Sequence, residues 1–333
     1  MGMMDMLGKF RKKPKEATMA EAMEAAHEAR RKIEKRREDI QKLRGVPLLE
    51  IEQYFNLQRH IRTDYDGSTL VVHHEPFTTW IDVVAPSLVF ETENVAALIQ
   101  MTTAVEKPFA EFVTDEASIN ALNANASGGA LIRAKDGRIL IGSRFTWFTE
   151  NNVWREELMP LIVEAAINAP RAIILSEKNR RDCLPPSVSG LTRWSERDFA
   201  AVREALPTHL RCTVDDMGIY AELFVLGGKT ALVRLDKGTV NPYLGPGLQA
   251  RINLPNRFET PEECLAMANI LNRKELSSVA AAWHYGAWYA RDNNRLSYIC
   301  FFPNNMWDHE AIINRWPELM QSRVDWASRE LLA

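Results

Sequence analysis

The sequence predicts an α+β fold with two tandem domains, each an antiparallel sheet flanked by helices, preceded by an N-terminal helical arm. One observation is length, because 333 residues are many for a single hydrophobic core. Another is composition, because hydrophobic residues make up 46% and charged residues 26%, which is typical of a globular protein. The third is internal repetition, because one motif and the segments before it occur twice in the same order.

The repeated motif reads Asn-Asn-x-Trp-x-x-Glu and occurs at 151–157 and again at 304–310. Asparagine at a helix start supplies a capping oxygen, a tryptophan in the first turn anchors the helix on a sheet, and an early glutamate favours the helix dipole. A binding signature is the alternative, but recurrence in both copies favours a fold-defining role. The motif residues are Asn151, Asn152, Trp154 and Glu157 in the first copy and Asn304, Asn305, Trp307 and Glu310 in the second.

Similarity between the copies continues upstream of this motif. The matched segments are 134–148 with 290–302 and 119–126 with 268–275, and the second pair aligns Leu122-Asn123 with Leu271-Asn272. Shared order with similar separations is much harder to obtain by chance than one motif, so we expect a duplicated unit.

Helix and strand signals follow one another along the whole second copy. Glu196 and Asp198 suit the start of a helix, and Thr260-Pro261 reads as an N-cap followed by proline at the first helical position. The expected order is a helix at 196–208, strands at 211–216, 219–227, 230–236 and 248–255, a helix from Pro261 to about Asn272, strands at 280–290 and 295–302, and a helix at about 307–332.

The first copy shows the same ending after a less regular beginning. Asp136-Gly137 predicts a hairpin turn, and a helix is expected from about Trp154 to Ala166. Strand-like segments precede them at 68–74, 78–84 and 87–92, and residues 180–190 have the Pro, Ser and Gly content of a linker. We therefore expect an arm at 1–45, a first domain at 46–178, a linker at 179–195 and a second domain at 196–333.

Three short stretches carry a resemblance to a known family. They are FFPNNMW at 301–307, Arg323-Val324-Asp325-Trp326 in the last helix, and Ala-Asn-x-Leu-Asn at 268–272. With the order of elements, they resemble the type III secretion chaperone-like superfamily, including its YbjN-type proteins, over 196–333 and more loosely over 47–170. The resemblance implies dimers that bind a partner segment in extended form on sheet and helix surfaces. The two copies here would then pair as a pseudo-dimer within one chain.

The predicted arm helix spans residues 17–44, which contain no Gly or Pro and are rich in Ala, Glu, Lys and Arg. Its apolar residues follow a weak seven-residue repeat that Arg36 interrupts. Three interpretations stay open: a solvated helix on its own domain, an oligomerisation or partner-docking helix, and a weak peripheral membrane contact through residues 1–15. The repeat comprises Met19, Ala22, Ala26, Ala29, Ile33, Ile40 and Leu43, and the membrane contact would use Met3, Met4, Met6, Leu7, Phe10, Lys9, Arg11, Lys12, Lys13 and Lys15.

Charge is divided unevenly along the chain. Residues 1–44 hold 13 of the 41 Lys and Arg and 8 of the 44 Asp and Glu, so the remainder holds 28 basic and 36 acidic residues. A body of net negative charge repels a phosphate backbone, so we expect no nucleic-acid binding by the globular part. The sequence has no apolar run of membrane-spanning length, no secretory signal pattern and no CxxC pair, which favours a cytoplasmic protein with reduced thiols.

Motifs for catalysis or cofactor binding are missing from the sequence. Gly227-Gly228-Lys229-Thr230 resembles the end of a phosphate-binding loop, but Leu223 replaces the required glycine and a strand follows, so a hairpin turn is expected. His73 and His74 are adjacent in a strand and point to opposite faces, which argues against a shared metal ion. We therefore expect no cofactor, no metal and no enzymatic activity, with a catalytic site assembled from distant residues as the alternative.

The expected function is non-enzymatic binding of a partner protein, chaperone-like or adaptor-like, with the arm as docking or assembly element. The alternative is a structural component of a larger assembly at a membrane surface. The copies match best at their C-terminal ends, so partner specificity is expected in their divergent front halves and in the arm.

Overall fold

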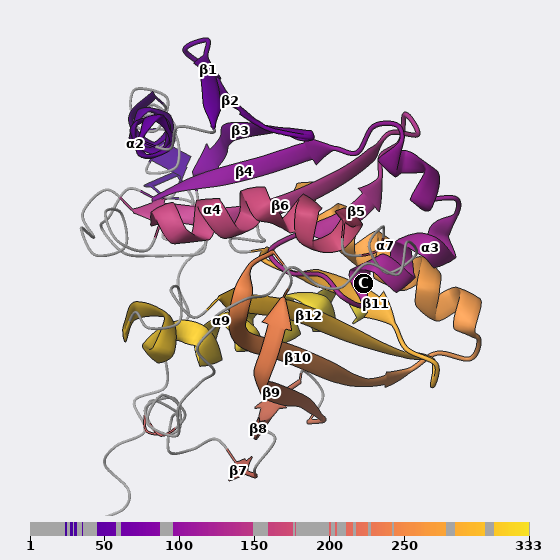
Figure 1. Cartoon of the computed structure of the whole chain (residues 1–333). Helices are drawn as coiled ribbons and strands as arrows, with labels where there is room; N and C mark the ends of the chain where they lie inside the picture. The colour runs from indigo at the N-terminus through magenta and orange to yellow at the C-terminus, as the bar shows by residue number, and fades with distance from the viewer. Residues whose placement is uncertain are drawn as a thin grey trace, which may run out of the picture.

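The computed structural model describes most of the chain beyond residue 44. The ranges are 45–57, 61–86, 96–148, 159–175, 211–215, 218–225, 228–241, 243–277, 284–303 and 310–332, with isolated positions at 24, 27, 28, 30, 31, 35, 177, 200 and 204. Over these residues the fold is α+β, as the sequence predicts, with two six-stranded antiparallel sheets and five α-helices. Figure 1 shows one sheet above the other.

The first copy comprises the elements between residues 45 and 175. Its strands are β1 (Arg62–Tyr65), β2 (Thr69–His74), β3 (Phe77–Pro86), β4 (Ala96–Ala104), β5 (Ala130–Arg133) and β6 (Ile139–Phe148), ordered β1-β2-β3-β4-β6-β5 in the sheet. Its helices are α2 (Gly45–Asn56), α3 (Glu116–Asn123) and α4 (Met159–Pro170), with a 3-10 turn η1 (Phe109–Phe112) and a π-helical turn η3 (Arg171–Leu175). Asp115 caps α3, because its carboxylate accepts a hydrogen bond from the Ser118 N–H at 2.7 Å.

The second copy comprises the elements between residues 211 and 332. Its strands are β7 (Cys212–Val214), β8 (Gly218–Phe224), β9 (Thr230–Asn241), β10 (Gly245–Arg257), β11 (Ala287–Ala290) and β12 (Arg295–Pro303), ordered β7-β8-β9-β10-β12-β11. Its helices are α7 (Pro261–Ser277) and α9 (Glu310–Leu332). Thr260 caps α7 as predicted, because its Oγ1 accepts a hydrogen bond from the Glu263 N–H at 3.1 Å.

The two sheets repeat one topology. Each is a four-stranded meander followed by a helix and a hairpin, and the second strand of that hairpin returns beside the fourth strand. The third strand of each sheet also carries one extra residue at the same point, between Val83 and Ala85 in β3 and between Asp236 and Thr239 in β9. A bulge is a specific irregularity of strand pairing, so its recurrence supports the duplication inferred from the sequence.

Some boundaries differ from the expectations. No strand was expected between residues 237 and 247, but β9 continues to Asn241 and β10 begins at Gly245. The Asn241 side chain accepts hydrogen bonds from the Tyr243 and Leu244 N–H groups at 2.9 and 3.1 Å, which tightens the connection. The α7 helix continues to Ser277 instead of about Asn272, and β11 begins at Ala287 instead of residue 280. The sequence did not indicate α2, β1 or β4, and the strand expected at 87–92 and the linker at 179–195 lie outside the described residues.

Two buried apolar clusters hold the fold, and each contains residues of both copies. The larger one joins Phe145 and Ile167 of the first copy to Trp288 and Trp326 of the second. The smaller one joins residues of α3 and β5 to Ala287 of β11 and to β12. Burial of each such large side chain contributes roughly 1.5–3 kcal/mol. The copies are therefore packed on one another through a common core.

The contact between the copies is reciprocal. The α3 helix of the first copy packs on β11 of the second, α7 of the second packs on β5 of the first, and α3 contacts α7. Figure 1 shows these four elements gathered at one side, between the sheets. Reciprocal contact between equivalent elements is the pattern that an approximate two-fold axis produces. This arrangement supports the interpretation of the chain as a pseudo-dimer.

Candidate protein-binding surface

Each sheet has one face covered by helices and one that is partly open. Side chains alternate between these faces along β3 and β9, so Ile81 and Leu235 are buried whereas Trp80 and Leu232 are exposed. We call the outer surfaces the first and the second open face. The first consists of Val71, His73, Trp80, Asp82, Val84 and Thr102, and the second of Tyr220, Glu222, Phe224, Leu232, Arg234, Asp236 and Arg251.

Large apolar side chains are exposed on both open faces. The exposed fraction is 37% for Trp80 and 42% for Val84 on the first face, and 64% for Phe224 and 43% for Leu232 on the second. Phe224 pairs with Thr230, which places Leu232 diagonally across from it on the neighbouring strand. A single exposed apolar residue is ordinary, but a pair on each open face marks a surface that can bind an apolar group.

A helix of the other copy borders each open face. On the first face, Thr102 pairs with Gly142 of β6, and a Cβ atom added at Gly142 would lie 2.6 Å from Leu276 Cδ1 of α7. On the second face, Arg251 pairs with Ile299 of β12, which is buried in one cluster with residues of α3. Each open face is thus a sheet surface with a helix of the other copy along one side.

One cross-strand row is the same on both open faces. Asp82 pairs with Gln100, and Asp236 pairs with Gln249 at the matching place in the register. In the first copy, Thr69 Oγ1 donates to Asp82 at 2.6 Å, and the Arg144 guanidinium donates to Gln100 Oε1 at 2.9 and 2.5 Å. These polar pairs fix the sheet surface beside the exposed apolar side chains.

The neighbouring row differs between the faces. On the first face it contains Val71, Trp80 and Thr102, in cross-strand order. On the second face the matching positions hold Tyr220, Arg234 and Arg251. The first row is therefore neutral and partly apolar, whereas the second carries two guanidinium groups.

The edge strands at the junction, β5 and β11, are closed by asparagine side chains. Asn123 of α3 makes two hydrogen bonds with the backbone N–H and C=O of Leu131, at 2.8 and 2.9 Å. Asn272 of α7 makes the same pair with Trp288, both at 2.8 Å. These bonds satisfy backbone groups that an added strand would otherwise use. They also give a physical role to the Leu-Asn match found in the sequence.

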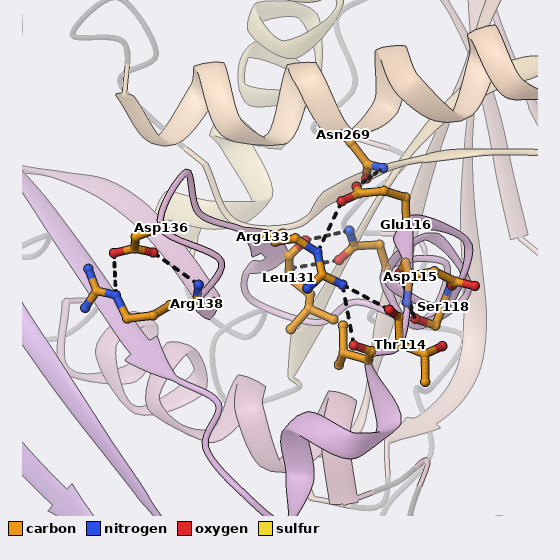
Figure 2. A network of polar contacts seen from close by, with 11 residues as sticks. Thr114, Asp115, Glu116, Ser118, Leu131, Arg133, Asp136, Arg138 and Asn269 are labelled. Carbon is orange, nitrogen blue, oxygen red and sulfur yellow. Dashed lines mark hydrogen bonds and ion pairs between the residues drawn. The ribbon is translucent and has the colours of Figure 1, made fainter.

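Each of these two helices carries a second asparagine three residues earlier, and its hydrogen-bond partners differ between the copies. Asn120 of α3 reaches the other copy, where it bonds the backbone N–H and C=O of Ala290 at 2.7 and 3.0 Å. The matching Asn269 of α7 donates instead to Glu116 Oε2 at 2.5 Å, and Glu116 also lies 3.4 Å from the Arg133 Nε. Figure 2 shows Asn269 and Arg133 converging on Glu116. The two-fold relation is therefore approximate at this position.

A charged cluster is enclosed at the junction. Glu275 of α7 is fully buried, accepts a hydrogen bond from Arg323 Nη1 at 2.6 Å and contacts His284 Nδ1. Burial alone would raise the pKa of Glu275, but the charges of His284 and Arg323 outweigh it and hold that pKa below its ordinary value. The backbone of His284 also pairs with that of Arg144 in β6, at 2.8 Å in both directions. The cluster therefore fastens α7, α9 and β6 together.

His73 and His74 point to opposite faces of the sheet, as predicted. His73 is on the first open face, with its Nε2 at 2.8 Å from the Asp64 carboxylate. His74 is buried, and its Nε2 is hydrogen-bonded to Thr79 Oγ1 at 2.8 Å. Burial lowers the pKa of His74 to about 3, with Arg171 and His73 adding to the effect. His74 is therefore a neutral core residue at physiological pH.

Most residues that the sequence singled out lie outside the described part of the chain. These are Asn151, Asn152, Trp154, Glu157, Asn304, Asn305 and Trp307 of the repeated motif, and Met3, Met4, Met6, Leu7, Phe10, Arg11, Lys12, Lys13, Ile33, Ile40 and Leu43 of the arm. Glu310 marks the start of α9. The open-face residues, in contrast, were not predicted from the sequence to form a binding surface.

The described residues contain no group of three or more His, Cys, Asp and Glu side chains placed to hold a metal ion. None of the described helices has the length and apolar composition needed to cross a membrane. No family model, curated protein or solved structure matches this chain.

Proposed function

We propose that the chain is a non-enzymatic protein-binding module, chaperone-like or adaptor-like, which holds an extended segment of a partner on its open faces. The observation that carries this proposal is the pair of exposed apolar side chains on each open face, beside a helix of the other copy. In an extended chain, alternate side chains point the same way, so such a chain can lie on a sheet surface with one set of side chains against it.

Two further points support binding over catalysis. The resemblance to the secretion chaperone-like superfamily implies the same use of sheet and helix surfaces, although likeness of fold alone is weak support for a function. In addition, Glu275 and His284, which lie in the charged cluster at the junction, are fully buried and out of reach of a substrate. Their arrangement suits a structural role, in which they hold α7, α9 and β6 together.

Site-specific photocrosslinking tests the proposal. A photoreactive phenylalanine analogue is placed at Trp80 or at Leu232, the cells are irradiated, and adducts are separated by mass and sequenced. We expect both positions to yield adducts with a defined partner, because both side chains are exposed on an open face.

The control position is Arg138, an exposed residue in the turn between β5 and β6 that belongs to neither open face. It should yield no adduct with the same partner. Equal labelling at all three positions, or none at Trp80 and Leu232, would contradict the proposal.

The arm is proposed as the docking or assembly element. Its described positions Glu24, His27, Glu28, Arg30, Arg31 and Lys35 are helical and exposed, which is compatible with docking on a partner helix. Deleting residues 1–44 and measuring mass in solution tests the idea, since an unchanged oligomer or complex would rule the arm out.

A further inference from the structure

Two arginines lie directly opposite each other on the second open face. Arg234 of β9 and Arg251 of β10 are cross-strand partners, so their side chains emerge next to each other on one side of the sheet. Like charges in this relation destabilise an antiparallel pair. The first copy avoids the problem, with Trp80 and Thr102 at the matching positions. The arginine pair is therefore not explained by the stability of the sheet.

The described residues offer the two guanidinium groups few hydrogen-bond acceptors. Arg234 Nε contacts the Asp236 carboxylate, and its guanidinium carbon lies 5.4 Å from the centroid of the Tyr220 ring. Arg251 Nη2 donates only a long hydrogen bond of 3.4 Å to Gln249 Oε1, and its buried Nε has no partner among the described residues. The described residues thus leave donors of both arginines without an acceptor, and a ligand can supply one.

Neighbouring charges do not cancel this positive group. Arg291 reaches the same surface from the turn after β11, where its Nη1 donates to Asn253 Oδ1 at 2.9 Å. Asn253 is two residues beyond Arg251 on β10, so both point to one side of the sheet. Glu222, the other acid of the second open face, lies 4.0 Å from Arg211. The local balance therefore favours an anionic ligand.

Apolar side chains stand at a defined spacing from the arginines. Leu232 is two residues before Arg234 on β9, which places the two side chains on one face at about 6.6–6.8 Å along the strand. Phe224 lies diagonally beside Leu232. An extended peptide has the same two-residue period, so one of its side chains can meet Leu232 while the second one along meets Arg234.

We infer that the second open face binds an extended peptide segment in which an apolar residue and an Asp or Glu lie two positions apart. The carboxylate accepts hydrogen bonds from Arg234 and Arg251, and the apolar residue packs on Leu232 and Phe224. This inference rests on the proposed function and specifies the ligand chemistry of one face. A peptide fits better than a nucleic acid, because the chain beyond residue 44 holds 36 acidic and 28 basic residues.

Binding of two labelled peptides to the full chain tests the inference. The probes are (Leu-Ser-Glu-Ser)3 and the neutral (Leu-Ser-Gln-Ser)3, each with fluorescein, and binding is followed by fluorescence anisotropy. We expect the Glu peptide to bind about tenfold or more tightly, since charge-assisted hydrogen bonds to guanidinium are stronger than neutral ones. The double variant Arg234→Gln and Arg251→Gln should bind both peptides equally.

Controls separate recognition from folding. Arg138→Gln removes an exposed arginine that pairs with Asp136 elsewhere on the first copy, and it should leave the preference for the Glu peptide unchanged. Arg291→Gln changes an exposed turn residue and should lower the affinity for the Glu peptide a few-fold, which is about the effect of one distant charge. Thermal unfolding of each variant shows whether the fold is intact.

Three results would overturn the inference. They are equal affinity of the natural chain for both peptides, an unchanged preference in the double variant, and tighter binding of a twelve-nucleotide oligothymidine that the double variant loses. Crosslinking at Leu232 together with equal affinity for the two peptides would overturn this inference alone and leave the proposed function standing. Peptide selectivity without crosslinks at either open face would instead count against a cellular protein partner.

Discussion

The two open faces occupy the same place in equivalent sheets and differ in one cross-strand row. Both keep the Asp–Gln row and the bulge in the third strand, and both lie beside a helix of the other copy. The next row contains Trp80 and Thr102 on the first face but Arg234 and Arg251 on the second. The Asp–Gln row and the Asn123 and Asn272 bonds to the edge strands are the same in both copies, whereas the exposed row differs. This difference is expected if the two faces bind different partner chemistry.

Removing the buried carboxylate of the second copy is expected to have the largest effect. Glu275 has no counterpart in the first copy, where the sequence alignment places Ala126. Glu275→Ala leaves Arg323 buried without its carboxylate, which should lower the free energy of unfolding by about 3–5 kcal/mol. Urea unfolding followed by circular dichroism measures this loss. The control Lys274→Ala removes a more exposed pair with Glu330 and should cost less than about 1 kcal/mol. Equal losses of stability in the two variants would contradict the structural role given to Glu275.

Substitutions of the four junction asparagines should give the next largest losses of stability, and the sizes of these losses should differ between the copies. Asn272→Ala leaves two backbone groups of Trp288 unpaired, which should cost about 2–4 kcal/mol, and Asn123→Ala should behave alike. Asn120→Ala should cost about 1–2 kcal/mol, because its partners are only partly buried. Asn269→Ala should cost less than about 1 kcal/mol, since its partner is a half-exposed carboxylate. The same unfolding experiment measures all four, and a reversed order would contradict the proposed roles.

The sequence predicts much of this fold and little of the candidate surface. The duplication follows from the repeated segments. The Asp136-Gly137 turn and the helices α7 and α9 follow from local patterns, because turn residues, caps and alternation are local signals. The strand β1 is short and charged, and β4 reads as an apolar run without alternation, so neither had a clear local signal. The Leu-Asn match was visible in the sequence, but its role depends on an edge strand brought beside it by the fold. Likewise, only the covering helices decide which side of β9 is exposed.

A pH-dependent effect follows from the difference between His74 and Leu223, its counterpart in the second copy. The pKa of His74 is about 3 in the folded chain and 6.5 ordinarily, so below about pH 6.5 the unfolded state binds a proton that the folded state does not. Stability should therefore fall as the pH drops from 6.5 toward 3, by at most about 2 kcal/mol at pH 5.

Urea unfolding at pH 7, 6 and 5 measures the contribution of His74. The variant His74→Leu should show a flatter pH dependence than the natural chain. A natural profile in His74→Leu would show that another group causes the acid sensitivity.

The smallest expected effect distinguishes a binding arginine from a structural one. Arg251→Gln removes one of two like charges that face each other, so it should raise the free energy of unfolding by a few tenths of a kcal/mol. Thr102→Gln, at the matching position of the first face, should change it by less. A clear loss of stability in Arg251→Gln would mean that the arginine serves the fold.

The most direct test of the account transfers the differing row from the second face to the first. The triple variant Thr78→Leu, Trp80→Arg and Thr102→Arg, which also gives the first face a leucine at the position that matches Leu232, is titrated with the (Leu-Ser-Glu-Ser)3 peptide, and the number of peptides bound per chain is measured by isothermal titration calorimetry. We expect one selective site in the natural chain and two in the variant, because the first face then carries the arginine pair. One site in both chains would contradict the claim that this row determines what each open face binds.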